Sequence, residues 1–151
     1  MGMKIEGEYI LYGPREIAYA VVRDPNILLL AIPGESTMNE TGPGAYEGTI
    51  KLKIGPVSGQ FAGLYTISEE NAPESFTMTV KGKGAAGFAE GVGRVHFDEL
   101  EGGKTLFKYS GELNIGGKLA SVGQRLMDSV SKSMLKNGLE KLDKEVEKRK
   151  L

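Results

Sequence analysis

The residues of this chain that could perform acid–base or nucleophilic chemistry are few and widely separated. His96 is the only histidine, and strand alternation places it on a polar face beside Arg94 and Asp98. A lone histidine in that position is more often a surface residue than a general base. The chain has no cysteine, which excludes disulfides, thiolate metal sites and cysteine nucleophiles. Because no spacing matches a nucleophile–base–orienter set or converging metal ligands, we predict no catalytic residue, no metal site and no cofactor.

Two other features share only part of the pattern of a chemical motif. The carboxylate pairs Glu69-Glu70 and Asp98-Glu99 lie beside predicted turns, where solvated charge is expected. Residues 81–88 are glycine-rich, but they lack the Gly-Lys-Ser/Thr ending of a phosphate loop and lead into a strand rather than a helix. A bulged strand or a rim around a cavity is the simpler interpretation.

The apolar faces of the predicted strands carry unusually small residues, namely Gly48, Gly63, Ala89, Gly91, Gly93 and Gly111. In one interpretation they permit the bends of a strongly curved sheet, and other side chains fill the space. In the other they leave an apolar cavity for a ligand, and both can hold together. The tyrosine hydroxyl groups on the same register would be the polar groups of that cavity. Leucine in place of Gly91 or Gly111 is then expected to fill the cavity while the fold survives.

These residues must be positioned by a run of short alternating strands and one long amphipathic helix. Strand patterns extend from about Lys4 to Ile115, and two short helices follow the first strand, at about residues 15–23 and from residue 25 to Pro33. Half-polar alternation joined by short turns indicates an antiparallel sheet with one covered face. The cover is a helix that begins near Gly117 and carries an apolar stripe of Leu119, Val122, Gly123, Leu126, Met127, Val130 and Met134. The sequence therefore predicts an α+β fold in which a curved sheet grips a C-terminal helix.

The end of the chain contains a second apolar stripe, rotated to nearly the opposite side of the helix, formed by Leu135, Leu139, Leu142 and Val146. Asn137-Gly138 lies where the stripe changes, and glycine is a helix-ending signal. We therefore predict a ligand-binding domain of residues 1–137 and a basic amphipathic helical tail of residues 138–151, which either continues the helix or folds back. If the helix is straight and exposes the stripe, the tail is a solvated helix end or a docking surface for a second protein chain or an anionic membrane.

Composition indicates one globular domain in a cytoplasmic protein. The 151 residues are 40% apolar and 26% charged, which is typical of a soluble protein. No apolar run approaches the roughly 20 residues of a membrane span, and the first strand is charged from its start, unlike a signal peptide. Residues 1–116 carry 10 basic and 15 acidic side chains, whereas residues 117–151 carry 9 basic and 5 acidic ones. This asymmetry lacks the concentrated basic face of a nucleic-acid-binding protein.

Several segments, in the right order over nearly the whole chain, resemble the carbon monoxide dehydrogenase CoxG family. They are PREIAY at 14–19, DP at 24–25, IPGES at 32–36, IGPVSGQFAG at 54–63, GAAGFAEG at 84–91, GGKLA at 116–120 and QRL at 124–126. The resemblance implies the START/Bet v 1-like (SRPBCC) superfamily and a helix-grip fold around a deep hydrophobic cavity. Members of the family are encoded with molybdenum hydroxylases such as carbon monoxide dehydrogenase. They are implicated in membrane attachment of that enzyme and in carrying a lipid-like quinone.

The function that follows from this resemblance is non-enzymatic binding or carriage of a lipid or quinone-like molecule, in association with molybdenum hydroxylase subunits. A peripheral position at the inner face of the membrane is compatible with it. Two alternatives remain, a ligand-free assembly or recruitment factor and a cyclase- or hydrolase-type enzyme, because the superfamily also contains such enzymes. We expect the ligand to contact Tyr9, Ile50, Leu52, Phe61, Tyr65, Met78, Phe88, Gly91, Phe107, Tyr109, Leu119, Val122, Leu126, Met127 and Val130.

Overall fold

The computed structural model describes residues 1–31 and 34–150 of the chain. Pro33, the predicted end of the second helix, lies outside the described residues. The elements follow one another as β1 (Gly2–Leu11), α1 (Arg15–Arg23), α2 (Pro25–Ala31), β2 (Ser36–Gly42), β3 (Ala45–Ile54), β4 (Val57–Asn71), β5 (Ser75–Gly84), β6 (Gly87–Leu100), β7 (Lys104–Gly116), the 3-10 helix η1 (Gly117–Val122) and α3 (Gln124–Arg149).

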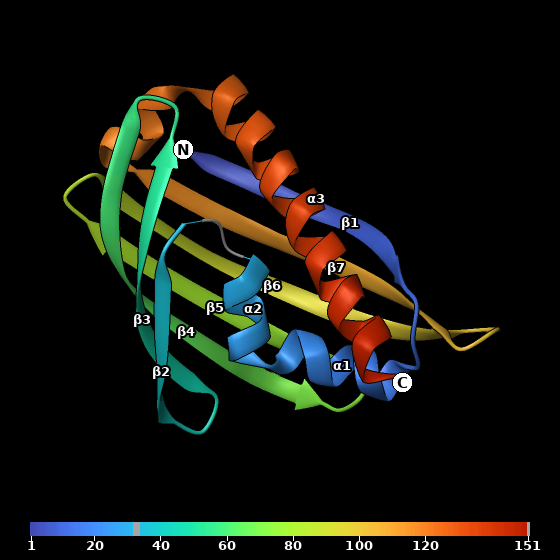
Figure 1. Cartoon of the computed structure of the whole chain (residues 1–151). Helices are drawn as coiled ribbons and strands as arrows, with labels where there is room; N and C mark the ends of the chain where they lie inside the picture. Colours follow the sequence, from blue (N-terminus) through green and yellow to red (C-terminus); the bar gives the residue numbers. More distant parts are fainter. Residues whose placement is uncertain (32–33, 151) are drawn as a thin grey trace.

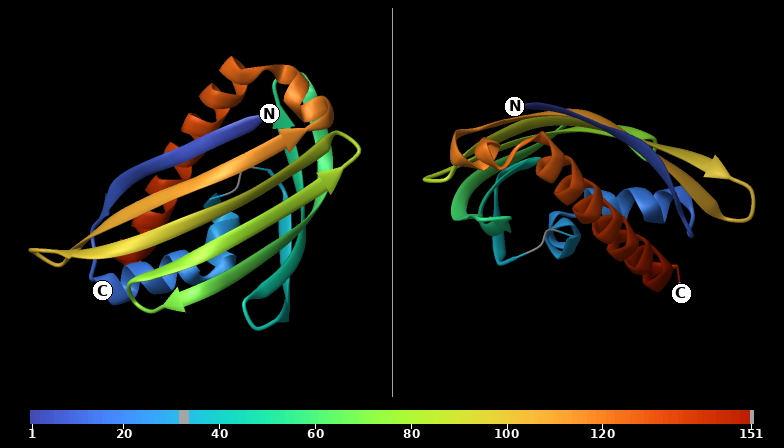
Figure 2. Two further views of the ribbon diagram at one scale, coloured as in Figure 1. Left: turned by 180° about the vertical axis from the view of Figure 1, so that it is seen from behind. Right: turned by 90° about the horizontal axis from the view of Figure 1, so that it is seen from above.

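The strands form one curved antiparallel sheet in the order β1-β7-β6-β5-β4-β3-β2, so the first strand pairs with the last. Figure 1 shows α3 lying across the concave face of this sheet, with α1 and α2 beside it. The view from above in Figure 2 shows the strands bending around the helices on one side only. The predicted α+β fold, a sheet that grips a long C-terminal helix, is confirmed.

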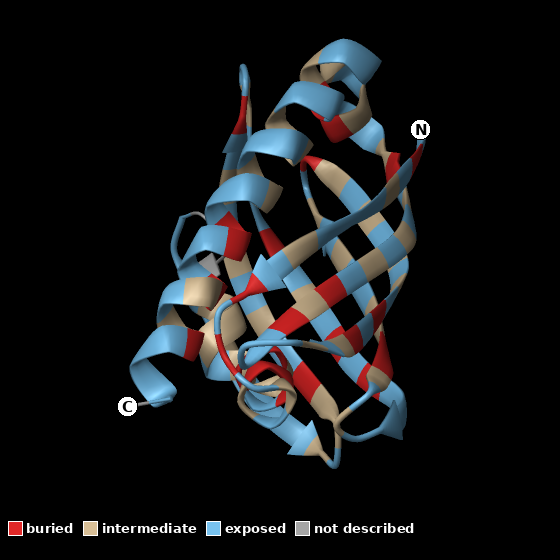
Figure 3. Cartoon of the chain, turned by 90° about the vertical axis from the view of Figure 1, so that its right-hand side faces the viewer, coloured by how far each residue is buried: buried red, intermediate tan, exposed pale blue. Residues whose placement is uncertain are grey.

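Strand alternation decides which side chains face the helices. In β4, Phe61, Tyr65 and Ile67 are buried against the concave face, while Ala62 and Thr66 between them are exposed on the convex face. Figure 3 shows the same alternation of buried and exposed residues along neighbouring strands. We refer to the concave side as the inner face and to the convex side as the outer face.

The inward registers predicted for the strands are confirmed. Phe107 is buried, and Ile50, Leu52 and Tyr109 are half-buried among the apolar residues of the inner face.

The apolar core consists of two separate clusters. The α1-end cluster is built around Tyr19, Phe76, Phe97 and Phe107, with the rings of Phe97 and Phe107 5.2 Å apart. The η1-end cluster contains Met3, Ile54, Phe61, Ala86, Ile115, Leu119 and Met127. Each buried aromatic or aliphatic side chain stabilises the fold by about 1.5–3 kcal/mol. The two clusters therefore hold the helices against opposite ends of the sheet.

The single helix predicted from Gly117 is in fact two helices. Leu119 and Val122 belong to η1, and α3 begins only at Gln124. Gly123 between them has φ +90° and ψ 157°, a conformation that ends η1 and redirects the chain. Only glycine adopts such a conformation readily, and the helical spacing of the stripe contains no sign of it.

Of the two alternatives predicted at Asn137-Gly138, a break and a continuing helix, the structure has the continuing helix. The helix α3 continues through Gly138, so the proposed boundary between residues 137 and 138 falls inside one helix. The prediction that a straight helix exposes the second stripe is wrong, because Leu139, Leu142 and Val146 are buried in the α1-end cluster. The reason is that the C-terminal half of α3 packs against α1, α2 and β1 rather than only against the sheet.

The C-terminal half of α3 is also joined to the end of β1 by polar contacts. The backbone N–H of Tyr12 donates to the Asp143 carboxylate at 2.8 Å, and Lys150 Nζ donates to the Tyr12 carbonyl at 2.8 Å. A Cβ atom at Gly13 would collide with the side chain of Val146, so glycine permits this close approach. The tail residues are therefore an integral part of the core and its surroundings.

Candidate ligand-binding site

The inner face between the two core clusters is lined largely by glycine. Cross-strand pairing joins Gly48 to Gly63 and Gly63 to Gly82, and it joins Gly93 to Gly111. With Gly91, these residues form what we call the glycine band. Val80 lies on the same inner register, between Tyr65 and Gly91, and yet it is 40% exposed. The helices and neighbouring side chains thus leave Val80 exposed and the glycine band half-buried, and we call this part of the inner face the inner hollow.

The glycines of the band do not all serve the same purpose. A Cβ atom at Gly111 would lie 2.7 Å from the Val92 carbonyl oxygen, and one at Gly91 would lie 2.9 Å from the Glu112 carbonyl oxygen. At Gly63 and Gly82 the nearest backbone oxygens would be 3.6 and 3.8 Å away, which is ordinary contact. Gly91 and Gly111 therefore allow neighbouring strands to approach each other closely. Leucine at either position would disturb the sheet, contrary to the expectation from the sequence that the fold survives. Gly63 and Gly82 only leave space.

Most of the predicted contact residues belong to the two core clusters on either side of the inner hollow. The α1-end cluster includes Tyr9, Tyr65, Met78, Phe107 and Tyr109. The η1-end cluster includes Ile50, Leu52, Phe61, Leu119, Val122, Met127 and Val130. Two predicted residues lie elsewhere.

Phe88 is on the outer face, where it is 36% exposed and its ring covers Gly116. It pairs with Lys83, one position out of the register that carries Ala89 and Gly91 inward. Leu126 belongs to neither cluster. It lies against the turn between β3 and β4, where a Cβ atom at Gly55 would be 2.7 Å from its Cδ2.

The hydroxyl group of Tyr65 is a polar atom without a protein partner at the α1 end of the inner hollow. It is shielded from solvent, and no acceptor or donor among residues 1–31 and 34–150 reaches it. Its ring packs against that of Tyr46, with centroids 5.9 Å apart. Burial raises the pKa of Tyr65 above its usual value, so the hydroxyl is protonated at neutral pH. An unpartnered buried polar group costs about 1–3 kcal/mol.

A polar network that the sequence did not reveal joins α1 to the start of β3 and the end of β4. Arg23 donates to both carboxylate oxygens of Glu70, at 2.9 and 3.1 Å, and to the Tyr46 hydroxyl at 3.2 Å. The Tyr19 hydroxyl donates to the same carboxylate at 2.8 Å. Glu70 is therefore not the free solvated charge predicted from its place beside a turn. No local signal could have found the pair, since 47 residues separate its members.

Glu70 should make stability depend on pH in the acid range. Hydrogen bonds from Arg23, and then from Tyr19, hold the pKa of Glu70 below its usual value. Because the folded pKa is lowered, this stabilisation is present above the unfolded pKa of about 4.3 and is lost as pH falls through the folded value. We expect Glu70→Gln to lower the free energy of unfolding by about 0.5–1 kcal/mol at pH 7. The difference from wild type should vanish near pH 2.

Urea unfolding at a series of pH values measures this difference. The control is Glu47→Gln, which removes an exposed carboxylate near the start of β3. A Glu70→Gln deficit that persists unchanged at low pH would show that the carboxylate charge is not its cause.

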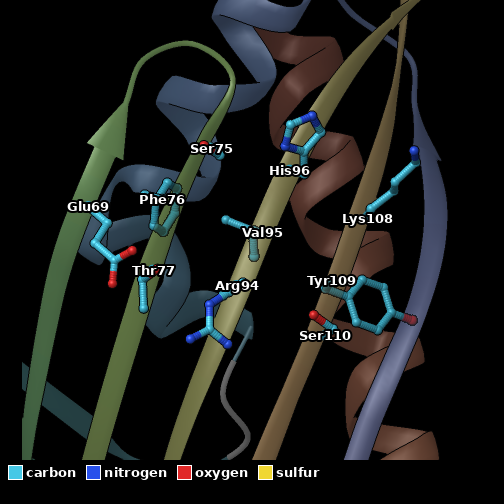
Figure 4. Close-up of a pocket in the computed structure, with 10 residues that line it drawn as sticks. All are labelled: Glu69, Ser75, Phe76, Thr77, Arg94, Val95, His96, Lys108, Tyr109 and Ser110. Atoms are coloured by element: carbon cyan, nitrogen blue, oxygen red, sulfur yellow. The ribbon is translucent and has the colours of Figure 1, made fainter.

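Two surface depressions of the described residues lie on the outer face. One, of about 340 Å³, lies between a row formed by Ser75, His96 and Lys108 and a row formed by Thr77, Arg94 and Ser110 (Figure 4). The other, of about 760 Å³, lies between two similar rows that begin at Gly2 and Lys4. Both are grooves between outward side chains, and the larger one also borders Met3, Val80, Gly91 and Leu113 of the inner register.

His96 occupies the outer face, as its register predicts. Its Nε2 lies 3.0 Å from Asp98 Oδ1, and Lys108 Nζ lies 2.7 Å from the other oxygen of the same carboxylate. These contacts form a polar surface cluster across β6 and β7. Within the part of the chain that the structure describes, no three His, Asp or Glu side chains are grouped to hold a metal ion. None of the helices in that part is long and apolar enough to cross a lipid bilayer.

A curved antiparallel sheet around a C-terminal helix, with an apolar inner face, is the helix-grip fold of START/Bet v 1-like proteins. Within it, the chain belongs to the carbon monoxide dehydrogenase CoxG family, whose sequence model matches residues 7–147. The resemblance noted from the sequence is thereby confirmed. No curated protein sequence matches the chain.

Solved structures share the fold over nearly their full length. A conserved protein from Geobacillus kaustophilus has a TM-score of 0.90 and 25% identity, with 97% of this chain and 96% of that chain covered. The ZhuI aromatase/cyclase from Streptomyces sp. R1128 has a TM-score of 0.73 and 10% identity, with 100% and 97% covered. A START superfamily protein from Mycobacterium smegmatis has a TM-score of 0.66 and 12% identity, with 96% and 97% covered.

Proposed function

We propose that this protein binds and carries a hydrophobic small molecule, a lipid or quinone-like compound, in the inner hollow without transforming it. The supporting observation is the divided core, in which two apolar clusters stabilise the fold and leave Val80 exposed and the glycine band half-buried between them. Covering apolar surface contributes about 25 cal/mol per Å². A ligand that fills the space beside Val80 would therefore complete the core.

We further propose that the carried molecule serves a molybdenum hydroxylase such as carbon monoxide dehydrogenase. The support is membership in the CoxG family, whose description names that enzyme. The protein would act on the cytoplasmic side, with peripheral contact to the inner face of the membrane during ligand exchange.

The chemistry of the inner face favours carriage over catalysis. On the inner register of β3–β7, between the two clusters, the titratable side chains are tyrosines, and burial raises the pKa of Tyr65 and of Tyr109. Protonated tyrosines can orient a ligand but are weak general bases at neutral pH. The similarity to an aromatase/cyclase, at 10% identity, concerns the fold alone. A cyclase-type enzyme is the second candidate function, and a ligand-free assembly factor is the third.

Ligand content tests the proposal. We expect native mass spectrometry of the purified protein to detect a bound apolar molecule, which solvent extraction recovers chemically unchanged. Adding 2-decyl-1,4-benzoquinone to stripped protein, at about 100 times its Kd, should raise Tm by about 5–10 °C.

Three results would speak against carriage. Absence of both a copurified ligand and a thermal shift would eliminate it. Recovery of a chemically altered quinone would favour the enzyme. Equal recruitment of a molybdenum hydroxylase before and after solvent extraction of the protein, with no thermal shift on adding the quinone, would favour the assembly factor.

A further inference from the structure

The hydroxyl group of Tyr65 is an inner-face feature that binding of a plain hydrocarbon leaves unexplained. Tyr65 is only 7% exposed, and its oxygen has no partner among the residues that the structure describes. The residue lies on the inner register directly beside Val80, which is 40% exposed. A buried hydrogen-bond donor is thus adjacent to the open part of the inner hollow.

We infer that Tyr65 donates a hydrogen bond to a carbonyl oxygen of the bound molecule, so that the hollow selects an apolar compound carrying such an oxygen over a plain hydrocarbon. This inference rests on the proposed function of carriage. The ligand class is then an amphipathic one, with an apolar body and a hydrogen-bond acceptor near its ring or head.

The neighbouring polar groups bind one another and not this donor. The Tyr46 hydroxyl, the nearest polar group of the adjacent ring, already accepts from Arg23 at 3.2 Å. Arg23 is in turn held by both oxygens of Glu70. Because burial keeps Tyr65 protonated, its hydroxyl offers a proton that the network around it does not take up.

The side chains that cover the hydroxyl are of a kind that can move. Met38 and Met78 are half-buried and pack against the α1-end cluster. Methionine is flexible and fills irregular gaps. Met78 lies over the glycine band, since a Cβ atom at Gly93 would be 3.3 Å from its Cγ. A ligand entering over Val80 could displace Met78 and bring its oxygen to Tyr65.

Tyr65→Phe tests the inference with two probes, 2-decyl-1,4-benzoquinone and decylbenzene, which share a decyl chain on a six-membered carbon ring and of which only the quinone has carbonyl oxygens. We expect the variant to bind the quinone about tenfold more weakly, which corresponds to about 1.4 kcal/mol, and to bind decylbenzene within twofold of wild type. The control Tyr12→Phe removes a hydroxyl from an exposed tyrosine outside the hollow and should change neither affinity. Native mass spectrometry measures all of these affinities.

Infrared difference spectra of the bound quinone supply a second readout on the wild-type protein. The carbonyl stretching band should shift to lower frequency in wild type and return toward its free value in Tyr65→Phe. Unchanged quinone affinity together with an unshifted band would overturn the inference and leave carriage intact. Equal weakening of both probes would also overturn it, because ring packing would then be the cause. Binding of neither probe to wild type would remove the proposed function, and this inference with it.

Discussion

Truncation after Asn137 is expected to unfold the protein. The deleted segment contains Leu139, Leu142 and Val146, which are 6%, 6% and 0% exposed in the α1-end cluster. Replacing one buried leucine by alanine lowers the free energy of unfolding by about 2–5 kcal/mol, and that free energy is about 5–15 kcal/mol for a whole domain. Loss of all three side chains, with the contacts to α1 and α2, should therefore exceed what the remaining core supplies. Circular dichroism and urea unfolding measure the outcome.

Single substitutions separate core packing from other effects of the deletion. Leu142→Ala should lower the free energy of unfolding by about 2–5 kcal/mol, whereas Lys144→Ala, an exposed change on the same helix, should stay within about 0.5 kcal/mol. A truncated chain that still unfolds cooperatively, with near wild-type stability, would show that α3 beyond Gly138 is dispensable for folding.

Leucine at Gly63 or Gly82 is expected to abolish ligand uptake while the fold survives. These two glycines face each other across β4 and β5 on the inner face, and an added Cβ atom meets only ordinary contacts there. A leucine side chain would then occupy the space that a ligand needs. Quinone binding by native mass spectrometry should fall below detection, and the urea midpoint should change little.

The matched control is Ala62→Leu, which adds similar volume one residue away on the outer face of β4, where the side chain is exposed. It should bind quinone as wild type does. Gly91→Leu and Gly111→Leu should instead be destabilised by about 1–3 kcal/mol or more, because their Cβ atoms would press on backbone oxygens. Wild-type affinity in both Gly63→Leu and Gly82→Leu would place the ligand outside the inner hollow.

The architecture was predictable because it depends on local periodicity. Alternation of apolar and polar residues with a period of two marks strands such as β4, and the side of each strand that faces the helices follows from it. Gly13-Pro14 and Asp24-Pro25 mark the ends of elements through backbone restrictions that belong to single residues. The same alternation placed His96 on the outer face and Tyr65 on the inner face. Phe88 was misplaced because it lies one position out of its strand's inward register.

The sequence by itself therefore determined the order of the elements and the face on which most side chains lie, since both follow from contacts between near neighbours along the chain. Only the tertiary structure decided what covers each face. The stripe of Leu139, Leu142 and Val146 is buried because α1, from the opposite end of the chain, lies beside it. The tertiary structure also decided that Arg23 pairs with Glu70 and that Gly63 has space for a side chain where Gly111 has none. Both depend on distances between segments far apart in the sequence, which no local pattern encodes.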